Sequence, residues 1–484
     1  MDRLSTAILP ALPADVARPA YDRAKVTSGI VHLGIGAFHR AHQAWYAEQA
    51  LAAGDLRWGI TAVSLRSSGV RDQMAPQNGL YTLATRDGGD ERLAVIGAVH
   101  RVLVAPEDPQ AVVAAMADAA CHIVSLTVTE KGYKLDPATG ALIADDPDLA
   151  ADMASLERPR TAPGLIVAAL ARRRAEGLMP FTAISCDNLP HNGARLAAAV
   201  TTLARAHDPA LADWIERHGA FPQTMVDRIV PATTDADVAA LAVRIGVEDR
   251  AMVKTEPFSQ WVIEDRFAGE RPDFEGVGVQ VTPAVAPWED AKLRLLNGAH
   301  SAIAYLGGLA GVEFVHEMVA QTPVRAFVER LWDEAAATLT PPPGLDVAAY
   351  RGDLIARFAN PALGHRTRQI AMDGSQKLPQ RLLAPIAERR ARGLEVEALA
   401  LGVAAWMKWQ GGRDDAGAAF VVDDPLAAVT AARLAGLTDP GERVAALLSI
   451  AAVFPAELAA DAVFRAVLTR QLAALDARGG LGVL

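Results

Sequence analysis

The chain has 484 residues, of which 51% are hydrophobic and 21% are charged, and its formal net charge is −10. This length exceeds that of a typical single domain, so we expect two domains, each able to bury a core without disulfides or metals. No long run of Lys or Arg interrupts the negative balance, which excludes nucleic acid and anionic membranes as main partners.

The cysteines and the N-terminal residues indicate a cellular compartment. Cys121 and Cys186 each lie in an apolar run, which is typical of buried thiols in a reducing environment. The first residues lack a basic region followed by an apolar core, so no signal peptide is predicted. The apolar run over residues 301–312 is shorter than the roughly 20 residues that cross a bilayer. We therefore predict a cytoplasmic protein.

The first half of the chain alternates strand-like and helical patterns. Runs rich in β-branched residues predict strands over residues 29–36, 58–66, 122–130 and 181–188. Helical patterns lie between them, over residues 37–54, 111–120 and 164–177. Strands that alternate with helices predict an α/β fold of the Rossmann type, with a doubly wound, mostly parallel sheet covered on both faces.

The sequence changes character near residue 282. Two prolines in residues 281–290 precede a long stretch rich in Ala and Leu, with helical periodicity. We therefore expect a Rossmann-type dinucleotide-binding domain over residues 1–286 and a mainly α-helical substrate and catalytic domain over residues 287–484. The proline-rich residues 340–344 are predicted to be a loop inside the second domain.

The first predicted strand runs directly into a glycine turn and then a helix. Gly34 and Gly36 allow the backbone to approach a pyrophosphate, with Ala37 and Phe38 opening the helix. His39 stands where the dinucleotide fingerprint has its third glycine. A simple tight connection is the alternative, but the place after the first strand favours nucleotide binding.

The second predicted strand ends where NAD enzymes place an acid for the adenosine ribose. Here Arg66 and two serines follow the strand, and the first acid is Asp72. NAD is the expected cofactor, and NADP stays open because Arg66 and the serines can accommodate a ribose phosphate. The alternative is that Arg66 is only a surface residue at the end of the strand. His39 and His42 are spaced as helical metal ligands, but no third ligand is obvious, so no metal site is predicted.

Oxidation of an alcohol by hydride transfer needs a base for the hydroxyl proton and donors for the developing alkoxide. Lys292, Asn297 and His300 fall on one broad face of a predicted helix, and a lysine acts as a base when its surroundings lower its pKa. An ideal helix separates Lys292 from His300 by about 12 Å, so the lysine stem or a break near Asn297 must close the gap. Ordinary polar positions on an amphipathic helix are the alternative.

Polar residues also follow predicted strands of the first domain. Asn188 closes residues 181–188 and is placed to donate an amide to a substrate oxygen, or else forms a turn with Asp187. The same two interpretations apply to residues 130–133 and to Asp227 with its neighbour Arg228.

Seven segments together resemble the polyol-specific long-chain dehydrogenases, a family that includes mannitol 2-dehydrogenase and fructuronate reductase. They are GIGAFHRAHQA (34–44), SLTVTEKGY (125–133), SCDNLPHNG (185–193), MVDRIVP (225–231), EPFSQWVIED (256–265), KLRLLNGAH (292–300) and IAMDGSQKLPQ (370–380). The resemblance implies a Rossmann-type first domain, a helical second domain and catalysis without a metal.

The resemblance also implies roles for individual residues. Lys292 would be the general base and Glu289 would conduct its proton to solvent. Asn188 and Asn297 would hold the alkoxide, and His300 would orient the substrate. The last set comprises supporting and substrate-contacting residues, namely Asp227, Lys377 and Arg368.

Two departures from the family pattern bear on substrate and cofactor. Gln369 stands where mannitol dehydrogenases of this family tend to have an arginine, with Arg368 beside it, and residues 68–69 replace the usual ribose acid. The expected activity is NAD-dependent oxidation of a polyol at C2 to a ketose, of the mannitol-to-fructose type. A fructuronate reductase, which interconverts mannonate and fructuronate, is the alternative, and a non-catalytic sugar or nucleotide sensor is the remote one. The partners implied are a polyol, a ketose or a hexuronate.

Overall fold

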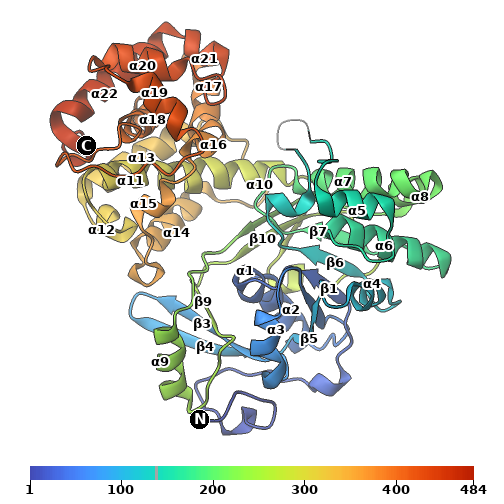
Figure 1. Cartoon of the computed structure of the whole chain (residues 1–484). Helices are drawn as coiled ribbons and strands as arrows, with labels where there is room; N and C mark the ends of the chain where they lie inside the picture. The colour runs from blue at the N-terminus through green and yellow to red at the C-terminus, as the bar shows by residue number, and fades with distance from the viewer. Residues whose placement is uncertain (137–139) are drawn as a thin grey trace. The chain divides into compact units, whose positions relative to one another are not determined.

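The computed structural model describes residues 1–136 and 140–484 of the chain. The chain forms two compact units, an N-terminal unit (Met1–Val285) and a C-terminal unit (Ala286–Leu484). In Figure 1 the N-terminal unit runs from blue to green and contains the strands, whereas the C-terminal unit runs from yellow to red and is helical.

The central sheet of the N-terminal unit has five parallel strands in the order β5-β2-β1-β6-β7. They are Val99–Val104 (β5), Ile60–Ser64 (β2), Ile30–Leu33 (β1), Ile123–Leu126 (β6) and Thr182–Ser185 (β7). Four of these strands were predicted and are confirmed, each shorter than its sequence pattern. A parallel sheet with helical crossovers confirms the predicted Rossmann-type fold.

Helices cover both faces of this sheet, and the alternation along β1 shows how. Val31 and Leu33 belong to the core under one helical layer, whereas Ile30 belongs to the core on the opposite face. The first layer comprises Pro109–Ala117 (α4), Ala162–Ala175 (α6), Asn192–His207 (α7) and Pro209–His218 (α8). The opposite face packs on Ala37–Ala41 (α1) and Gln43–Ala52 (α2). The predicted helix over residues 37–54 is therefore two helices, separated at His42 (φ −117°, ψ −84°).

Two small sheets complete the N-terminal unit, and neither was predicted. One contains Asp90–Ile96 (β4), Tyr81–Asp87 (β3) and Val253–Thr255 (β9). The other contains Gln280–Thr282 (β11), Gln260–Glu264 (β10) and Thr224–Asp227 (β8). The remaining helices of this unit are Gly69–Met74 (α3), Pro147–Ala154 (α5) and Asp235–Ile245 (α9), with a 3-10 turn at Glu130–Tyr133 (η4).

The C-terminal unit is built around Gly298–Leu309 (α11), which is buried along almost its whole length. Its Gly and Ala residues allow Glu397–Trp409 (α18) and Ala462–Gly482 (α22) to pack closely against it. The other helices are Ala286–Ala291 (α10), Val315–Val319 (α12), Thr322–Ala336 (α13), Val347–Ala359 (α14), Thr367–Ile370 (α15), Gly374–Leu378 (α16), Ala384–Ala391 (α17), Ala427–Leu434 (α19), Pro440–Leu448 (α20) and Ala456–Ala460 (α21). Residues 340–344 lie between α13 and α14, outside any helix, as predicted.

Two π-helical turns interrupt the helices of this unit, at Lys292–Asn297 (η6) and Pro379–Leu383 (η8). The two turns pack against each other through Gly298, where an added Cβ would lie 3.0 Å from the Arg381 carbonyl oxygen. Such turns are uncommon and occur often at functional sites. The first turn starts at Lys292, the predicted base, and the second starts two residues after Lys377, a predicted substrate contact.

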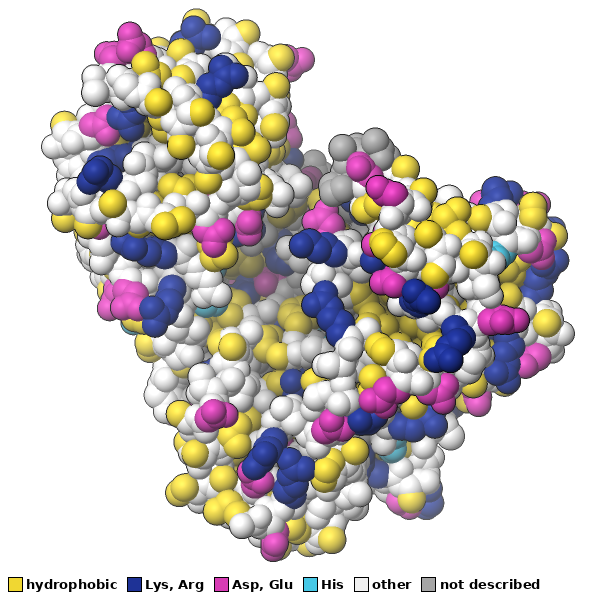
Figure 2. All heavy atoms as spheres, viewed as in Figure 1, with side chains coloured by type: hydrophobic (Ala, Val, Ile, Leu, Met, Phe, Trp, Pro, Cys, Tyr) yellow, Lys and Arg dark blue, Asp and Glu magenta, His cyan; other side chains and the backbone are white. Residues whose placement is uncertain are grey.

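The described residues contain no helix that is both long and apolar enough to cross a membrane. On the face seen in Figure 2, Lys and Arg side chains lie among Asp and Glu side chains rather than in one continuous basic patch. Cys121 and Cys186 are both buried free thiols.

Candidate active site

The glycine turn after β1 has the geometry that a dinucleotide requires. Gly34 has φ +100°, and an added Cβ would lie 2.1 Å from the Thr127 carbonyl oxygen, so only glycine fits there. Gly36 is exposed, and a Cβ on it would meet no atom nearer than 4.0 Å. A ligand can therefore approach the backbone at Gly36, next to the half-buried Ala37 and Phe38.

The loop after β2 places the residues expected near the adenosine ribose. Arg66 is exposed, and the Ser68 hydroxyl donates to the Asp72 carboxylate at 2.6 Å. Arg71 pairs with the same carboxylate at 2.9 Å. The first acid of this segment is thus held by Ser68 and Arg71, and Arg66 remains exposed to solvent.

A buried carboxylate at the end of β7 organises the next predicted segment. Asp187 accepts hydrogen bonds from the Val128 amide (3.1 Å), the Thr129 amide (2.8 Å) and the Tyr133 hydroxyl (2.7 Å). Burial raises the pKa of Asp187, and these donors oppose that rise. Asn188 follows directly and is exposed at the carboxyl end of the strand, where a ligand of a parallel sheet lies.

Asp227 ends β8 and is buried. The next residue, Arg228, donates to the Ala41 carbonyl oxygen at 2.5 Å and to that of Glu256 at 3.2 Å. Arg228 also lies over the Trp45 ring, and burial lowers its pKa to about 10. This arginine ties the end of β8 to the end of α1, so it has a structural role that the sequence alone did not reveal.

In the C-terminal unit, η6 arranges the residues of the predicted catalytic segment. A π-helix bonds each amide to the carbonyl five residues back, as the Gly298 amide does with Leu293. Five residues span about one turn of a π-helix, so Lys292 and Asn297 lie closer together around this turn than the broad face of the predicted α-helix would place them. Lys292 is 7% exposed. A break near Asn297 was one of the two expectations for this helix, and the structure has a π-helical turn that starts at Lys292 and ends at Asn297.

The side chains of Trp332 and Arg294 hold η6 in place. The Trp332 indole donates to the Leu295 carbonyl oxygen at 2.8 Å. Buried Arg294 donates to the Thr338 carbonyl oxygen at 2.9 Å and to the Glu388 carboxylate at 2.8 Å. Hydrogen bonds to Trp332, Thr338 and Glu388, which all lie outside the turn, therefore hold it in place.

Glu289 lies just before η6 on α10. Burial and the neighbouring Asp290 raise its pKa to about 7, and Lys292 opposes this rise. A carboxyl group with this pKa exchanges protons readily near neutral pH. His300 lies on α11 beyond the turn. Burial, followed by the nearby His365 and Arg381, lowers its pKa well below the ordinary value, so its imidazole is neutral.

Basic side chains gather around His300. Arg381 is half-buried, and burial lowers its pKa to about 10. Among the described residues it pairs with no carboxylate, and its one hydrogen bond is to the Ser301 hydroxyl at 3.0 Å. Lys377 donates to the Met372 carbonyl oxygen at 2.6 Å, and its distance to the Asp373 carboxylate is 4.0 Å. The surroundings of His300 are therefore positively charged.

Arg368, which was predicted to contact the substrate, lies on α15 beside a cleft of the C-terminal unit. Its guanidinium lies 5.2 Å from the centre of the Phe420 ring and 3.8 Å from the Asp414 carboxylate. Together with Gln369, Trp409 and Asp423 it lines a cleft of about 270 Å³. Met372 also lines this cleft, and its carbonyl oxygen accepts the hydrogen bond from Lys377.

Comparisons with known proteins assign the chain to a family. Residues 28–276 match the family model of the mannitol dehydrogenase Rossmann domain, and residues 284–476 match that of the mannitol dehydrogenase C-terminal domain. The chain belongs to the mannitol dehydrogenase family. The resemblance predicted from the sequence motifs is confirmed.

Individual members of the family match this chain over most of its length. An uncharacterized oxidoreductase of Escherichia coli (strain K12), YeiQ, is 47% identical over 92% of each chain. The D-mannonate oxidoreductase of the same organism is 44% identical over 96% of each chain. A solved mannitol 2-dehydrogenase of Pseudomonas fluorescens, in ternary complex with NAD and D-mannitol, is 38% identical with a TM-score of 0.85, and the match covers 99% of this chain and 98% of that one.

These relatives confirm that the chain is an oxidoreductase of a family that acts on CH–OH groups. The expected nicotinamide cofactor agrees with the NAD in the solved relative. The roles of the individual residues remain predictions, and the described residues contain no cluster of three or more His, Cys, Asp or Glu side chains with metal-site geometry.

Proposed function

We propose that this protein is an NAD-dependent secondary-alcohol dehydrogenase that oxidises a sugar-derived polyol or aldonate at C2, with Lys292 as the general base and no catalytic metal. The observation that carries the proposal is the π-helical turn η6, which brings buried Lys292 and Asn297 to one side. The solved relative with NAD and D-mannitol supports the cofactor and the class of reaction.

The residues of the chain divide the chemistry between them. Lys292 takes the hydroxyl proton, while the amides of Asn188 and Asn297 donate to the oxygen as its negative charge develops. His300 is neutral, and its Nε2 has no hydrogen-bond partner among the described residues, so it can orient a substrate hydroxyl. Glu289 passes the proton from Lys292 towards solvent. NAD, when bound at the Gly34–Gly36 turn, supplies the hydride acceptor.

A second candidate, oxidation of an aldonate such as mannonate, is favoured by the charges around His300. Half-buried Arg381 pairs with no carboxylate of the described residues, and Lys377 is held mainly by backbone carbonyls. A partly buried cation without an anion is unfavourable, and a substrate carboxylate would form strong charge-assisted hydrogen bonds there. The 44% identity to a D-mannonate oxidoreductase points in the same direction.

The remote alternative, a sugar or nucleotide sensor without catalysis, is disfavoured by the same geometry. A binding protein has no need of a buried lysine on the same π-helical turn as an asparagine and one turn from a carboxyl group whose pKa is about 7.

Initial rates with NAD and NADP against mannitol, arabinitol, sorbitol and mannonate, with fructose and fructuronate in reverse, test the proposal. We expect NAD to be preferred, with Arg66→Ala harming only the reaction with NADP. Mannonate as the best substrate would select the second candidate. In that case Arg381→Met should raise the KM for mannonate much more than that for mannitol. Cofactor binding without turnover of any substrate would favour the sensor.

A further inference from the structure

A chain of hydrogen bonds lies behind the glycine turn. The Ser125 hydroxyl lies 2.7 Å from Nδ1 of His32, and Nε2 of His32 lies 2.9 Å from the Thr127 hydroxyl. The Thr127 hydroxyl donates to the Gly34 carbonyl oxygen at 2.7 Å. His32 is fully buried, on β1, and both hydroxyl groups come from β6 or its end. We call these three side chains the turn relay.

The turn relay has a single hydrogen-bond direction. Burial lowers the pKa of His32 to about 3, so its imidazole is neutral and carries one proton. The Thr127 hydroxyl donates its one proton to the Gly34 carbonyl oxygen. Its oxygen must therefore accept a hydrogen bond from Nε2–H of His32. Nδ1 is then an acceptor, and the Ser125 hydroxyl donates a hydrogen bond to it. Each group therefore has one role, and the relay ends at the carbonyl of the turn.

That carbonyl is a fixed point of the turn. The Gly36 amide donates to the Gly34 oxygen at 2.7 Å, in addition to the Thr127 hydroxyl. The Gly34 peptide is planar, so holding its oxygen also sets the direction of the Ile35 amide, which donates to the Val63 carbonyl. Loss of the Thr127 hydroxyl would remove one of the two hydrogen bonds that hold this oxygen and would loosen the peptide at the turn.

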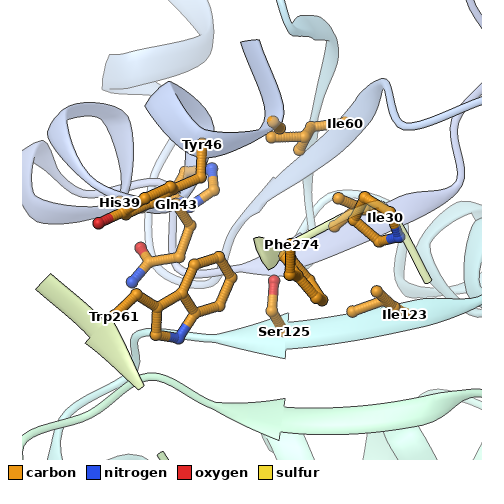
Figure 3. Close-up of a pocket in the computed structure, with 11 residues that line it drawn as sticks. Ile30, His39, Gln43, Tyr46, Ile60, Ile123, Ser125, Trp261 and Phe274 are labelled. Atoms are coloured by element: carbon orange, nitrogen blue, oxygen red, sulfur yellow. The ribbon is translucent and has the colours of Figure 1, made fainter. Parts of the chain in front are cut away.

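His39, on α1, packs against the turn relay. Its ring stacks on His32, with 3.4 Å between ring centres and 13° between planes. His39 occupies the place of the third fingerprint glycine, whose usual task is close packing of helix on strand. Figure 3 shows His39, Gln43 and Tyr46 from the α1–α2 segment around a small cavity that Ser125 also lines. The stacked rings of His32 and His39 thus provide the contact between helix and strand that the third glycine usually allows.

We propose that Ser125, His32 and Thr127 are positioning residues that set the affinity for the cofactor from behind the Gly34–Gly36 turn, with His39 stacked on His32 to hold the relay in one arrangement. This inference rests on the proposed function only in assuming that the turn binds the dinucleotide.

Paired substitutions at Thr127 test the inference. Thr127→Val keeps the shape and removes the hydroxyl, whereas Thr127→Ser keeps the hydroxyl. We expect Thr127→Val to raise the Kd for NADH, measured by fluorescence titration, about 3- to 10-fold, the effect of one lost hydrogen bond. The KM for NAD should rise in parallel, with kcat at saturating NAD nearly unchanged. Thr127→Ser should bind NADH like the wild type.

A control separates positioning from general stability. Thr61 on β2 donates to the Ser28 hydroxyl at 3.1 Å, near the other end of the same sheet, so Thr61→Val removes a comparable bond. It should lower the Tm without changing the Kd for NADH. Ser125→Ala should weaken NADH binding in the same direction as Thr127→Val, and the double variant should show less than the sum of the two effects.

Two outcomes are distinguishable. If the wild-type protein binds no nicotinamide cofactor, the proposed function fails. If the wild type binds NADH and folded Thr127→Val and Ser125→Ala both keep the wild-type Kd, the turn relay has no positioning role and the inference is overturned.

Discussion

Asp187 illustrates how much a single buried carboxylate determines. Asp187 accepts a hydrogen bond from the Thr129 amide, and Thr129 has φ +66° and ψ 167°. For a residue other than glycine, this conformation costs about 1–3 kcal/mol. Asp187 holds this strained backbone and also precedes Asn188. A pattern of residues reveals the Asp-Asn pair, but it does not reveal which backbone amides the carboxylate will accept.

We expect Asp187→Asn to lower kcat about tenfold or more, because its NH2 group replaces one of the two accepting oxygens and so opposes either the Thr129 amide or the Val128 amide, which displaces Asn188. The variant should be measured for kcat and for urea denaturation. Asp152→Asn is the matched control, since Asp152 is fully buried and accepts the Arg160 and Thr161 amides away from any predicted catalytic residue. If both variants lose stability equally and neither loses turnover, Asp187 does not position Asn188.

Glu289 gives a prediction about pH. Its pKa of about 7 means that it accepts the proton of Lys292 only when it is deprotonated, so alcohol oxidation should speed up as pH rises through 7. We expect Glu289→Gln to remove this step from the kcat profile. Asp290→Asn should keep the step and move it to lower pH, because Asp290 raises the pKa of Glu289. An unchanged profile in Glu289→Gln would exclude Glu289 from proton transfer.

At the scale of elements, the chain is predictable where its signals are local. Strands β1, β2, β6 and β7 follow runs of β-branched residues, and so they were found. Strand β9 has only three residues, and it pairs with β3, where Leu83 lies opposite Val253. The two strands are too far apart in the sequence for a local pattern to reveal their pairing. The turn relay escaped prediction for the same reason, because His32 and Ser125 are 93 residues apart. The π-helical turns have no periodicity of their own, and only the axial gap between Lys292 and His300 indicated an irregularity.

The contact between the two π-helical turns also leads to a test. In Gly298→Ala the new Cβ would lie 3.0 Å from the Arg381 carbonyl oxygen, so η8 must shift by a few tenths of an ångström. We expect a loss of stability of about 1 kcal/mol and a higher KM for the sugar substrate. Gly352→Ala, at an exposed position of α14 with open space around it, should instead stabilise the protein by about 0.5–1 kcal/mol. An unchanged KM in Gly298→Ala would mean that η8 does not shape the substrate site.

At the scale of the whole molecule, buried histidines make stability depend on pH. Burial lowers the pKa of His32 to about 3 and that of His365 to about 4. Between these values and about 6.5 the unfolded chain binds protons that the folded protein excludes, so stability falls as pH falls below 6.5. Each histidine contributes up to about 1.4 kcal/mol per pH unit in that window.

Urea denaturation between pH 7 and pH 5 should therefore show a falling free energy of unfolding. Glu289 acts in the opposite direction, because its raised pKa contributes stability that is lost as pH rises from about 4.5 to 7. His365→Asn should make the fall less steep, and Glu289→Gln should make it steeper. A free energy of unfolding that does not change between pH 7 and 5 would contradict the neutral, buried state of these histidines.

The most direct test of the central claim is the pH profile of kcat for Lys292→Ala, measured in the direction of alcohol oxidation. We predict a loss of about 10²–10⁴-fold, the usual contribution of a positioned proton transfer, with the ascending limb removed and the Kd for NADH unchanged. Small primary amines should restore part of the rate. Lys408→Ala, which removes a lysine bound to Asp415 and to the Leu475 carbonyl, should lower stability and leave the profile intact. A folded Lys292→Ala variant with near wild-type turnover and the same limb would contradict a role for Lys292 as the base.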